Sequence, residues 1–340
     1  MSNKVTRRVL AGLLLAASVS SLGATGALAE VSELRVAKQY GLGFLPLMVM
    51  ESETLFEKRA QELGLDVTVS WLTLGGPAAV NEALLADNVD MVSNGPPSFL
   101  IMWNRTQDTP QSVRSIAPVS QLPMWLNTSN PDVKSLEDFT EEDRIAVTAV
   151  KTSIPAIIMQ MWAAEKWGPE NYERLDALTT SLPHPDGMAA LLSDTEITAH
   201  FTSPPYQYIE VESEGIHRVA TSYELMGSPA TFTMIYTTDV FVEENPQTAQ
   251  AFFTALQDAQ KFIADNPDRA ADIYLDLAAE GGVTKEQVLE ILADPDVQFT
   301  ATPQGLMAYA AFMNEVGTLT AVPAEWTELF FEGVHDLPGN

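Results

Sequence analysis

The feature that most constrains the fold is a repeated alternation of short β-rich runs with helical patterns. Residues 33–40 (ELRVAKQY) alternate in polarity as a strand does, and a helical pattern follows the break at residues 41–46 (GLGFLP). The runs at 65–74 and 89–95 are also β-rich, and each precedes a helical pattern. Strands that alternate with helices at this spacing predict a parallel sheet with helices on its faces.

A second series of the same kind begins with the β-rich run at residues 144–150 (RIAVTAV). It follows a proline-containing run at residues 115–128, which suits a segment that crosses between lobes better than a central strand. Residues 230–246 have the character of a second crossing strand, and the chain after them, to about residue 333, is mostly helical. We therefore predict an α/β protein of two lobes with mostly parallel sheets and two crossing strands, with residues 30–120 and 230–340 in lobe one and residues 121–229 in lobe two. This layout is typical of hinged binding proteins, although a multi-lobed enzyme could share it.

The first 29 residues have the pattern of a secretory signal. A basic start with Lys4, Arg7 and Arg8 is followed by an apolar run too short to span a bilayer, and then by a small-residue site at 27–29 (ALA). The Arg pair also fits a twin-arginine signal, so both the general secretory (Sec) route and the twin-arginine (Tat) route remain open. We expect cleavage after Ala29 and a soluble mature protein, most simply in a periplasm.

The chain is strongly acidic. It contains 46 Asp and Glu residues against 18 Lys and Arg residues, and loss of the signal with its three positive charges would change the formal net charge from −28 to −31. Such a surface repels nucleic acid and anionic lipid, so we expect neither as a partner. The chain has no Cys, which excludes disulfides, thiolate metal sites, a Cys nucleophile and a lipidated N-terminal Cys.

The sequence contains no recognisable catalytic, metal or nucleotide motif. The four His residues are scattered; we interpret His184, between two prolines, as a loop residue and His200 as a strand residue rather than as ligands. No GxSxG precedes a helix, and no GxGxxG or GxxxxGKS/T follows a strand. We therefore expect no enzymatic activity, no cofactor and no metal.

Three strand-to-helix turns share one character and are the strongest candidates for a binding site. Glycine lets a ligand approach the backbone, and the free N–H groups and dipole of a helix start favour an anion. Any one such turn is also how an ordinary helix begins, but three of them at the carboxyl ends of strands predict an anion cradle between the lobes. The three turns are Gly75-Gly76-Pro77, Asn94-Gly95-Pro96-Pro97-Ser98 and Lys151-Thr152-Ser153, which precedes Pro155.

Aromatic residues near these turns are candidates for the wall of a cleft. We assign Phe44, Trp125 and Tyr206 to that role, because an aromatic wall could sandwich a planar group or hold a cationic amine. Three tryptophans at helical spacing on apolar faces are expected in the core instead: Trp103, Trp162 and Trp167.

Residues 34–98, from LRVAKQYGLGFLPLMVM to VDMVSNGPPS, resemble the ABC-transporter substrate-binding proteins of the nitrate/sulfonate/taurine group. That group is related to a domain shared with proteins of thiamine-pyrimidine synthesis. Weaker similarity follows at residues 144–160, 188–206 and 237–274. The resemblance implies a type II periplasmic binding protein fold that delivers a small ligand to an ABC permease in the inner membrane.

The resemblance also implies a set of cleft-lining residues. Carried over by position, the set is Phe44, Pro46, Gly75, Gly76, Pro77, Asn94, Gly95, Pro96, Ser98, Thr152, Ser153, Ser203 and Tyr206. The match at Ser203 and Tyr206 is loose, because the family often has a tryptophan and an acidic residue there, and that position helps select the ligand.

These observations favour one hypothesis over two others. The main hypothesis is a monomeric, non-catalytic receptor that binds a small organic anion, of sulfonate or taurine type or nitrate, and hands it to a permease. The second is a receptor of the same fold for a thiamine-pyrimidine precursor or an amine held by aromatic residues. The third, a pyrimidine-synthesis enzyme, is disfavoured because those enzymes rely on a Cys-rich motif and this chain has no Cys.

Overall fold

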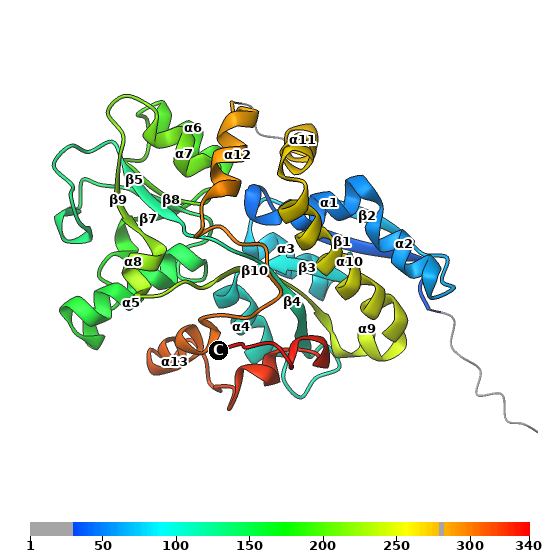
Figure 1. Ribbon diagram of the computed structural model, residues 1–340. Helices are drawn as coiled ribbons and strands as arrows, with labels where there is room; N and C mark the ends of the chain where they lie inside the picture. Colours follow the sequence, from blue (N-terminus) through cyan, green and yellow to red (C-terminus); the bar gives the residue numbers. More distant parts are fainter. Residues whose placement is uncertain (1–29, 279–281) are drawn as a thin grey trace, which may run out of the picture.

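Two five-stranded mixed sheets, one in each lobe, form the framework of the computed structural model (Figure 1). The structure describes residues 30–278 and 282–340, so the signal expected at residues 1–29 lies outside the described residues. Helices pack against both sheets. The prediction of an α/β protein with two lobes is confirmed.

The lobe-one sheet combines strands from the beginning of the described chain with one from much later. Its order is β2-β1-β3-β10-β4, with β1 parallel to β2 and β3, and β10 antiparallel to β3 and β4. Because β1, β2 and β3 are parallel, the turns that follow them gather at one edge of the sheet. The strands are β1 (Glu33–Lys38), β2 (Thr68–Thr73), β3 (Met91–Asn94), β4 (Val113–Gln121) and β10 (Thr231–Thr238).

The lobe-two sheet repeats this layout with shorter strands. Its order is β7-β6-β8-β5-β9, with β6 parallel to β7 and β8, and β5 antiparallel to β8 and β9. The sequence patterns do not indicate β7 and β9, because both are short edge strands with partly exposed side chains. The strands are β5 (Trp125–Thr128), β6 (Ile145–Val147), β7 (Thr179–Ser181), β8 (Ala199–Thr202) and β9 (His217–Thr221).

The two crossings between the lobes start from neighbouring strands. β4 and β10 are antiparallel, and Gln121, where the chain leaves lobe one, is paired with Thr231, where it returns. The Ser120 and Thr233 hydroxyls are 3.0 Å apart across the same pair of strands. Both crossings therefore lie side by side, whereas the lobe bounds at 120/121 and 229/230 stay a prediction.

The prediction of a strand that continues to residue 246 was wrong. β10 ends at Thr238, whose hydroxyl accepts a hydrogen bond from the Phe241 N–H at 3.2 Å. This N-cap starts α9 (Asp239–Glu244), so a local side-chain bond ends the β-rich run eight residues early.

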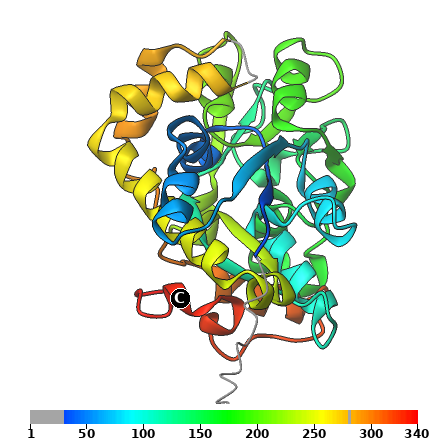
Figure 2. The ribbon, with the colours of Figure 1, turned by 90° about the vertical axis from the view of Figure 1, so that its right-hand side faces the viewer.

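Helices from the C-terminal part of the chain complete lobe one. α10 (Pro246–Asp265) and α11 (Pro267–Leu277) lie beside α1 (Leu45–Glu53) and α2 (Leu55–Glu62), as Figure 2 also shows. Within residues 30–278 and 282–340, none of the helices has the length and apolarity that a membrane span needs. The other helices are α3 (Pro77–Leu85), α4 (Pro96–Thr106), α5 (Ile154–Trp167), α6 (His184–Leu192), α7 (Tyr206–Val211), α8 (Ser222–Met226), α12 (Lys285–Ala293) and α13 (Leu306–Glu315).

The segment that links α12 to α13 runs along both crossings. Gln298 exchanges two backbone hydrogen bonds of 2.7 Å with Gln121. The Thr231 N–H donates to the Gln304 carbonyl at 2.9 Å, and the Gln304 N–H donates to the Thr231 hydroxyl at 3.0 Å. The crossings are thus flanked by a third stretch of backbone.

The prediction that the chain is helical up to about residue 333 was also wrong, over residues 323–333. The segment forms two 3-10 turns, Trp326–Leu329 and Glu332–Val334. The Phe331 N–H donates to the Ser115 carbonyl at 2.9 Å, and this tertiary bond to β4 holds the chain extended between the two turns.

The packing of α10 yields a stability prediction. Phe252 is fully buried, with its ring centroid 6.1 Å from that of Phe56 on α2, whereas Phe253 next to it is only partly buried. Phe252→Ala should lower the free energy of unfolding by about 3–5 kcal/mol, because it leaves a cavity, and Phe253→Ala should cost clearly less. Urea denaturation of both variants measures the difference; equal losses would contradict this account of the core.

Candidate functional site

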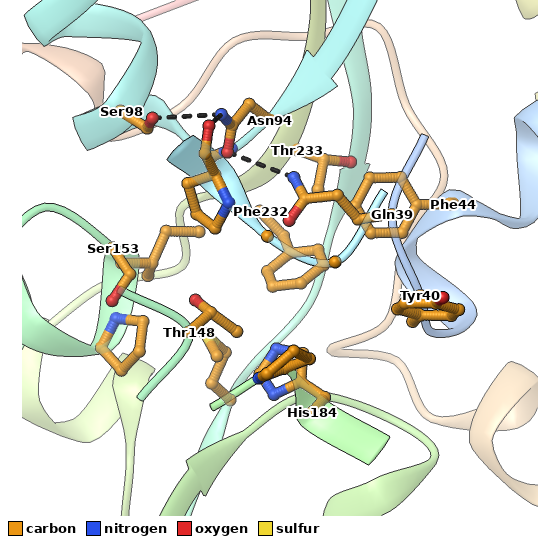
Figure 3. A pocket seen from close by; sticks show the side chains of 18 residues that line it. Gln39, Tyr40, Phe44, Asn94, Ser98, Thr148, Ser153, His184, Phe232 and Thr233 are labelled. Atoms are coloured by element: carbon orange, nitrogen blue, oxygen red, sulfur yellow. Dashed lines mark hydrogen bonds between the residues drawn. The ribbon is translucent and has the colours of Figure 1, made fainter. Parts of the chain in front are cut away.

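A cleft that is open to solvent lies between the lobes (Figure 3). Its lobe-one side is formed by residues after β1 and β3, by the starts of α3 and α4, and by β10. Its lobe-two side is formed by the end of β6 and the starts of α5 and α6. Four helix N-termini therefore converge on the cleft, and each supplies partial positive charge.

The start of α4 offers fewer backbone donors than the glycine-rich turn predicts. Pro96 and Pro97 occupy the first two helical positions and have no N–H, so Ser98 is the first residue of the helix that has one. The Gly95 N–H already donates to the Asn94 side-chain oxygen at 2.9 Å. Ser98 is therefore the main donor that α4 can turn toward the cleft.

The Ser98 side chain is poised to donate a hydrogen bond. Its Oγ accepts from Nδ2 of Asn94 and from Nδ2 of Asn81, both at 3.0 Å, which leaves its own hydrogen free of these bonds. Asn94 is held on its other side by Gln39, whose Nε2 donates to Oδ1 at 3.2 Å (Figure 3). Asn94 thus orients Ser98 and has little capacity left for a ligand.

The start of α5 differs from that of α4. Ser153 donates its hydroxyl hydrogen to the Ala149 carbonyl at 2.6 Å, so its Oγ faces the cleft as an acceptor. Ile154 and Ala156 keep their backbone N–H groups on either side of Pro155. The donors of this helix start are therefore backbone groups.

No Lys, Arg, Asp or Glu is among the described residues that line the cleft. Lys151, the cation nearest in sequence to the α5 turn, is directed to Glu173 at 2.9 Å and Asp176 at 3.6 Å. Apolar and aromatic groups make up much of the wall, among them Phe44 and Phe232, whose ring centroids are 6.3 Å apart. The cleft lining is thus uncharged, with polar groups on a largely apolar surface, and a carboxylate, that of Asp186, lies in the adjoining pocket beside Tyr40 and Pro183.

His184 begins α6 and lines the cleft (Figure 3). Its Nδ1 lies 2.9 Å from the Thr202 hydroxyl, and its ring stacks on Tyr206 with a centroid distance of 5.6 Å. Burial, and to a smaller degree the neighbouring His200, hold the pKa of His184 well below its usual range. His184 is therefore neutral at pH 7 and can accept or donate one hydrogen bond at Nε2.

Eight of the fourteen residues expected from the sequence lie at the cleft, where ligand contact stays a prediction for each. They come from the turns after β1, β2 and β3 and from the α5 start, where backbone geometry alone fixes the position. The eight are Phe44, Gly75, Gly76, Pro77, Asn94, Gly95, Ser98 and Ser153.

The other six lie away from the cleft lining. Trp125 packs on Tyr208 with a centroid distance of 4.3 Å, and Tyr206 is fully buried behind His184. Ser203 is also fully buried, and its Oγ makes no hydrogen bond within the described chain. Pro46, Pro96 and Thr152 complete the six; they sit in the same turns and helix starts as the lining residues but do not line the cleft.

The sequence analysis missed several lining residues. His184, interpreted as a loop residue, is the first residue of α6; Pro183-His184-Pro185 follows β7 and is a strand-to-helix turn of the same kind as the other three. Recognition of β7 would have revealed it. The remaining missed residues are Gln39, Tyr40, Met124, Thr148, Ile154, Pro155, Pro183, Phe232 and Thr233.

The lobes touch at two places. The Leu42 N–H, just after β1, donates to the Pro204 carbonyl of lobe two at 2.9 Å. At the α4 start, a Cβ on Gly95 would lie 2.7 Å from Cδ1 of Ile154 in lobe two. The absence of a side chain at Gly95 is therefore what allows α4 and α5 to approach.

Two mixed α/β sheets, two adjacent crossings and a cleft where helix N-termini meet define a periplasmic binding protein fold. Within that fold, the chain belongs to the NMT1-like family, whose family model matches residues 28–275. No curated protein sequence gives a significant match.

Solved structures of the same fold include three named binding proteins. The alkanesulfonate-binding protein SsuA from Xanthomonas axonopodis pv. citri, bound to MOPS, matches with a TM-score of 0.67 at 16% identity, over 86% of this chain and 96% of that chain. The periplasmic aliphatic sulphonate binding protein SsuA from Escherichia coli matches with a TM-score of 0.62 at 16% identity, over 89% and 100%. The periplasmic nitrate-binding protein NrtA from Synechocystis PCC 6803 matches with a TM-score of 0.62 at 16% identity, over 77% and 70%. At these identities the likeness establishes the fold.

The close approach at Gly95 can be tested. Gly95 has an ordinary φ of −77°, so Gly95→Ala strains no backbone and acts only through the contact with Ile154. We expect the lobes to move apart and the radius of gyration from small-angle X-ray scattering to rise. The double variant Gly95→Ala/Ile154→Ala should restore the original value. An unchanged radius in the single variant would mean that Ile154 moves aside within a closed cleft.

Proposed function

We propose that this protein is a solute-binding receptor of an ABC importer that captures a small organic anion of sulfonate or taurine type, or nitrate, between its lobes. The observation that carries the proposal is the convergence of four helix N-termini on a cleft with no carboxylate among its described lining residues. An anion at that point would meet partial positive charge from four helices. Solved proteins of the same fold that are named as sulfonate- and nitrate-binding support this ligand class.

The apolar wall supports an organic rather than a purely inorganic anion. Phe44, Phe232, Met124 and Ile154 line the cleft beside the polar groups of the helix starts. Such surfaces bind a hydrocarbon or ring portion by the hydrophobic effect, while backbone N–H groups bind the acid group. We therefore favour an organosulfonate over nitrate.

The receptor role also fixes the partner and the location that we propose. A monomeric receptor in the periplasm would deliver the ligand to permease subunits in the inner membrane. The secretory pattern of residues 1–29 and the acidic composition agree with an exported protein that does not bind nucleic acid or anionic lipid. We propose no catalytic role, because the hydrogen bonds of the two cleft serines go to Asn side chains and to a backbone carbonyl and not to a base.

One observation favours a second ligand class. The described cleft lining has no Lys or Arg to neutralise an anion and does have the aromatic rings of Tyr40, Phe44 and Phe232. Such a site would also suit a neutral or cationic ring, for example a thiamine-pyrimidine precursor.

A thermal-shift screen, followed by calorimetry, separates the two classes. The panel contains ethanesulfonate, taurine, nitrate, acetate and hydroxymethylpyrimidine. We expect the sulfonates to stabilise the protein, by about 2.7 kcal/mol when their concentration is 100 times the Kd. Stabilisation by the pyrimidine alone would establish the second class, and stabilisation by none of the panel would contradict the proposed function.

The hydrogen bonds at the helix starts predict different roles for two serines that the sequence pattern treats alike. Ser98→Ala removes a side-chain donor and should weaken sulfonate binding by about 1.5–3 kcal/mol, as expected for a hydrogen bond to a charged group. Ser153→Ala is the matched control, because its hydroxyl hydrogen is already given to Ala149. Calorimetry with ethanesulfonate measures both. Equal effects would show that Ser98 does not contact the acid group.

A further inference from the structure

A buried carboxylate and imidazole lie directly behind the cleft in lobe two. His200 on β8 and Glu210 on α7 are both fully buried, and Nδ1 of His200 lies 2.6 Å from Oε1 of Glu210. The other carboxylate oxygen accepts a hydrogen bond from the Asn127 amide at 2.8 Å. Within the described chain no Lys or Arg pairs with this carboxylate, so His200 is its basic partner. We refer to His200 and Glu210 together as the buried pair.

The other titratable side chains on the elements packed around the buried pair are exposed or engaged elsewhere. Tyr208 on α7 donates to Asp294 at 3.2 Å, and burial, together with that carboxylate, raises its pKa. Strands β5 and β6 contribute no titratable side chain. The remaining groups are the exposed Asp186 on α6, Tyr206 on α7 against the His184 ring, His217 on β9 bonded to the Val133 carbonyl, and Arg218 on β9 over the Trp125 ring.

The buried pair is connected to the cleft through His184. Nε2 of His200 lies 3.4 Å from Nδ1 of His184, and the ring of His184 lines the cleft (Figure 3). Gly187 on α6 makes room for this contact, because a Cβ there would lie 2.6 Å from Nε2 of His200. The Thr202 hydroxyl lies 2.9 Å from the same Nδ1. It can donate or accept, so it can form a hydrogen bond whether or not Nδ1 of His184 carries a proton.

The number of protons on the buried pair decides what His184 presents to the cleft. With one proton, His200 donates through Nδ1 to Glu210, its bare Nε2 accepts from Nδ1–H of His184, and Nε2 of His184 is left as an acceptor. With a second proton, Nε2–H of His200 donates to Nδ1 of His184. His184 then carries its own proton on Nε2 and donates into the cleft.

The charge of the buried pair changes in the same step. With one proton the pair has a net charge of −1 in a fully buried place, which is costly and repels an anion in the cleft. With two protons the pair is neutral. The low pKa of His184 means that the added proton stays on the pair and is not taken by the cleft residue.

We propose that anion binding in this cleft takes up one proton from solvent, which is held on the His200–Glu210 pair and turns Nε2 of His184 into a hydrogen-bond donor to the ligand. The proton returns to solvent when the anion leaves. The added proton removes the negative charge of the buried pair, which no Lys or Arg in the described cleft lining would offset. The inference rests on the proposed function, since it takes the ligand to be an anion.

Calorimetry with ethanesulfonate in buffers of different ionisation enthalpy counts the protons taken up on binding. As the pH rises, we expect uptake to approach one proton for each anion bound. The affinity should then fall by up to about tenfold for each pH unit. Binding of ethanesulfonate with no proton uptake, at every pH between about 5 and 9, would overturn the proposal.

Glu210→Gln removes the group that shares the proton and keeps an oxygen that can accept from His200. Proton uptake and the pH dependence of affinity should both be lost in this variant. Glu214→Gln, an exposed change four residues further along, is the matched control and should behave as the original protein does. Retained uptake in the Glu210 variant would overturn the assignment to the buried pair.

Nitrogen-15 NMR of the histidine rings tests whether the protonation of the buried pair sets the tautomer of His184. The test needs no ligand and no change at the pair. The chain has four His residues, and His217→Gln with His335→Gln leaves only the two of interest in the spectrum. As the pH falls, the proton on His184 should move from Nδ1 to Nε2 while His200 becomes doubly protonated. A single His184 tautomer throughout would overturn the proposal. If no anion binds but the tautomer changes, the proposed ligand class is wrong, whereas the coupling between the buried pair and His184 is confirmed.

Discussion

The pairing of β4 with β10 is the interaction on which the rest of this structure depends. The two strands are the only neighbours in the described sheets that both lead directly into a crossing, and their register places Gln121 opposite Thr231. Because the chain leaves and re-enters lobe one at this one place, the two sheets are held with their helix starts facing each other. Phe232 and Thr233 on β10, and Met124 in the crossing that follows β4, line the cleft together with residues of both lobes.

The cleft shows how a site can be polar without being charged. Proline at the start of α4 fixes the direction of the helix but removes two donors, and the loss is offset by the Ser98 hydroxyl, which Asn94 and Asn81 hold in place. At α5 the side chain is turned back to the backbone and the N–H groups remain. The two helix starts thus present different hydrogen-bond donors to the cleft: α4 presents a side-chain hydroxyl, and α5 presents backbone N–H groups.

The sequence was sufficient for the parts of this molecule that local chemistry determines. The alternation of strands and helices predicts both sheets, and the Gly and Pro turns lead to residues such as Gly76, Gly95 and Ser153 at the cleft. It was insufficient where tertiary contacts decide. Trp125 was placed in the cleft wall because it is aromatic and near the crossing, but Tyr208 and Arg218 hold it in lobe two. His184 was missed because the strand before it is too short to give a pattern.

The third stretch of backbone along the crossings changes what kind of hinge this is. Two crossing strands alone would let the lobes swivel about a few torsion angles. Here Gln298 and Gln304 add hydrogen bonds to Gln121 and Thr231, so an opening motion must flex three linked stretches of backbone together. Residues 282–340 contribute nothing to the described cleft lining, yet they share in setting the stiffness of the motion that admits and releases the ligand.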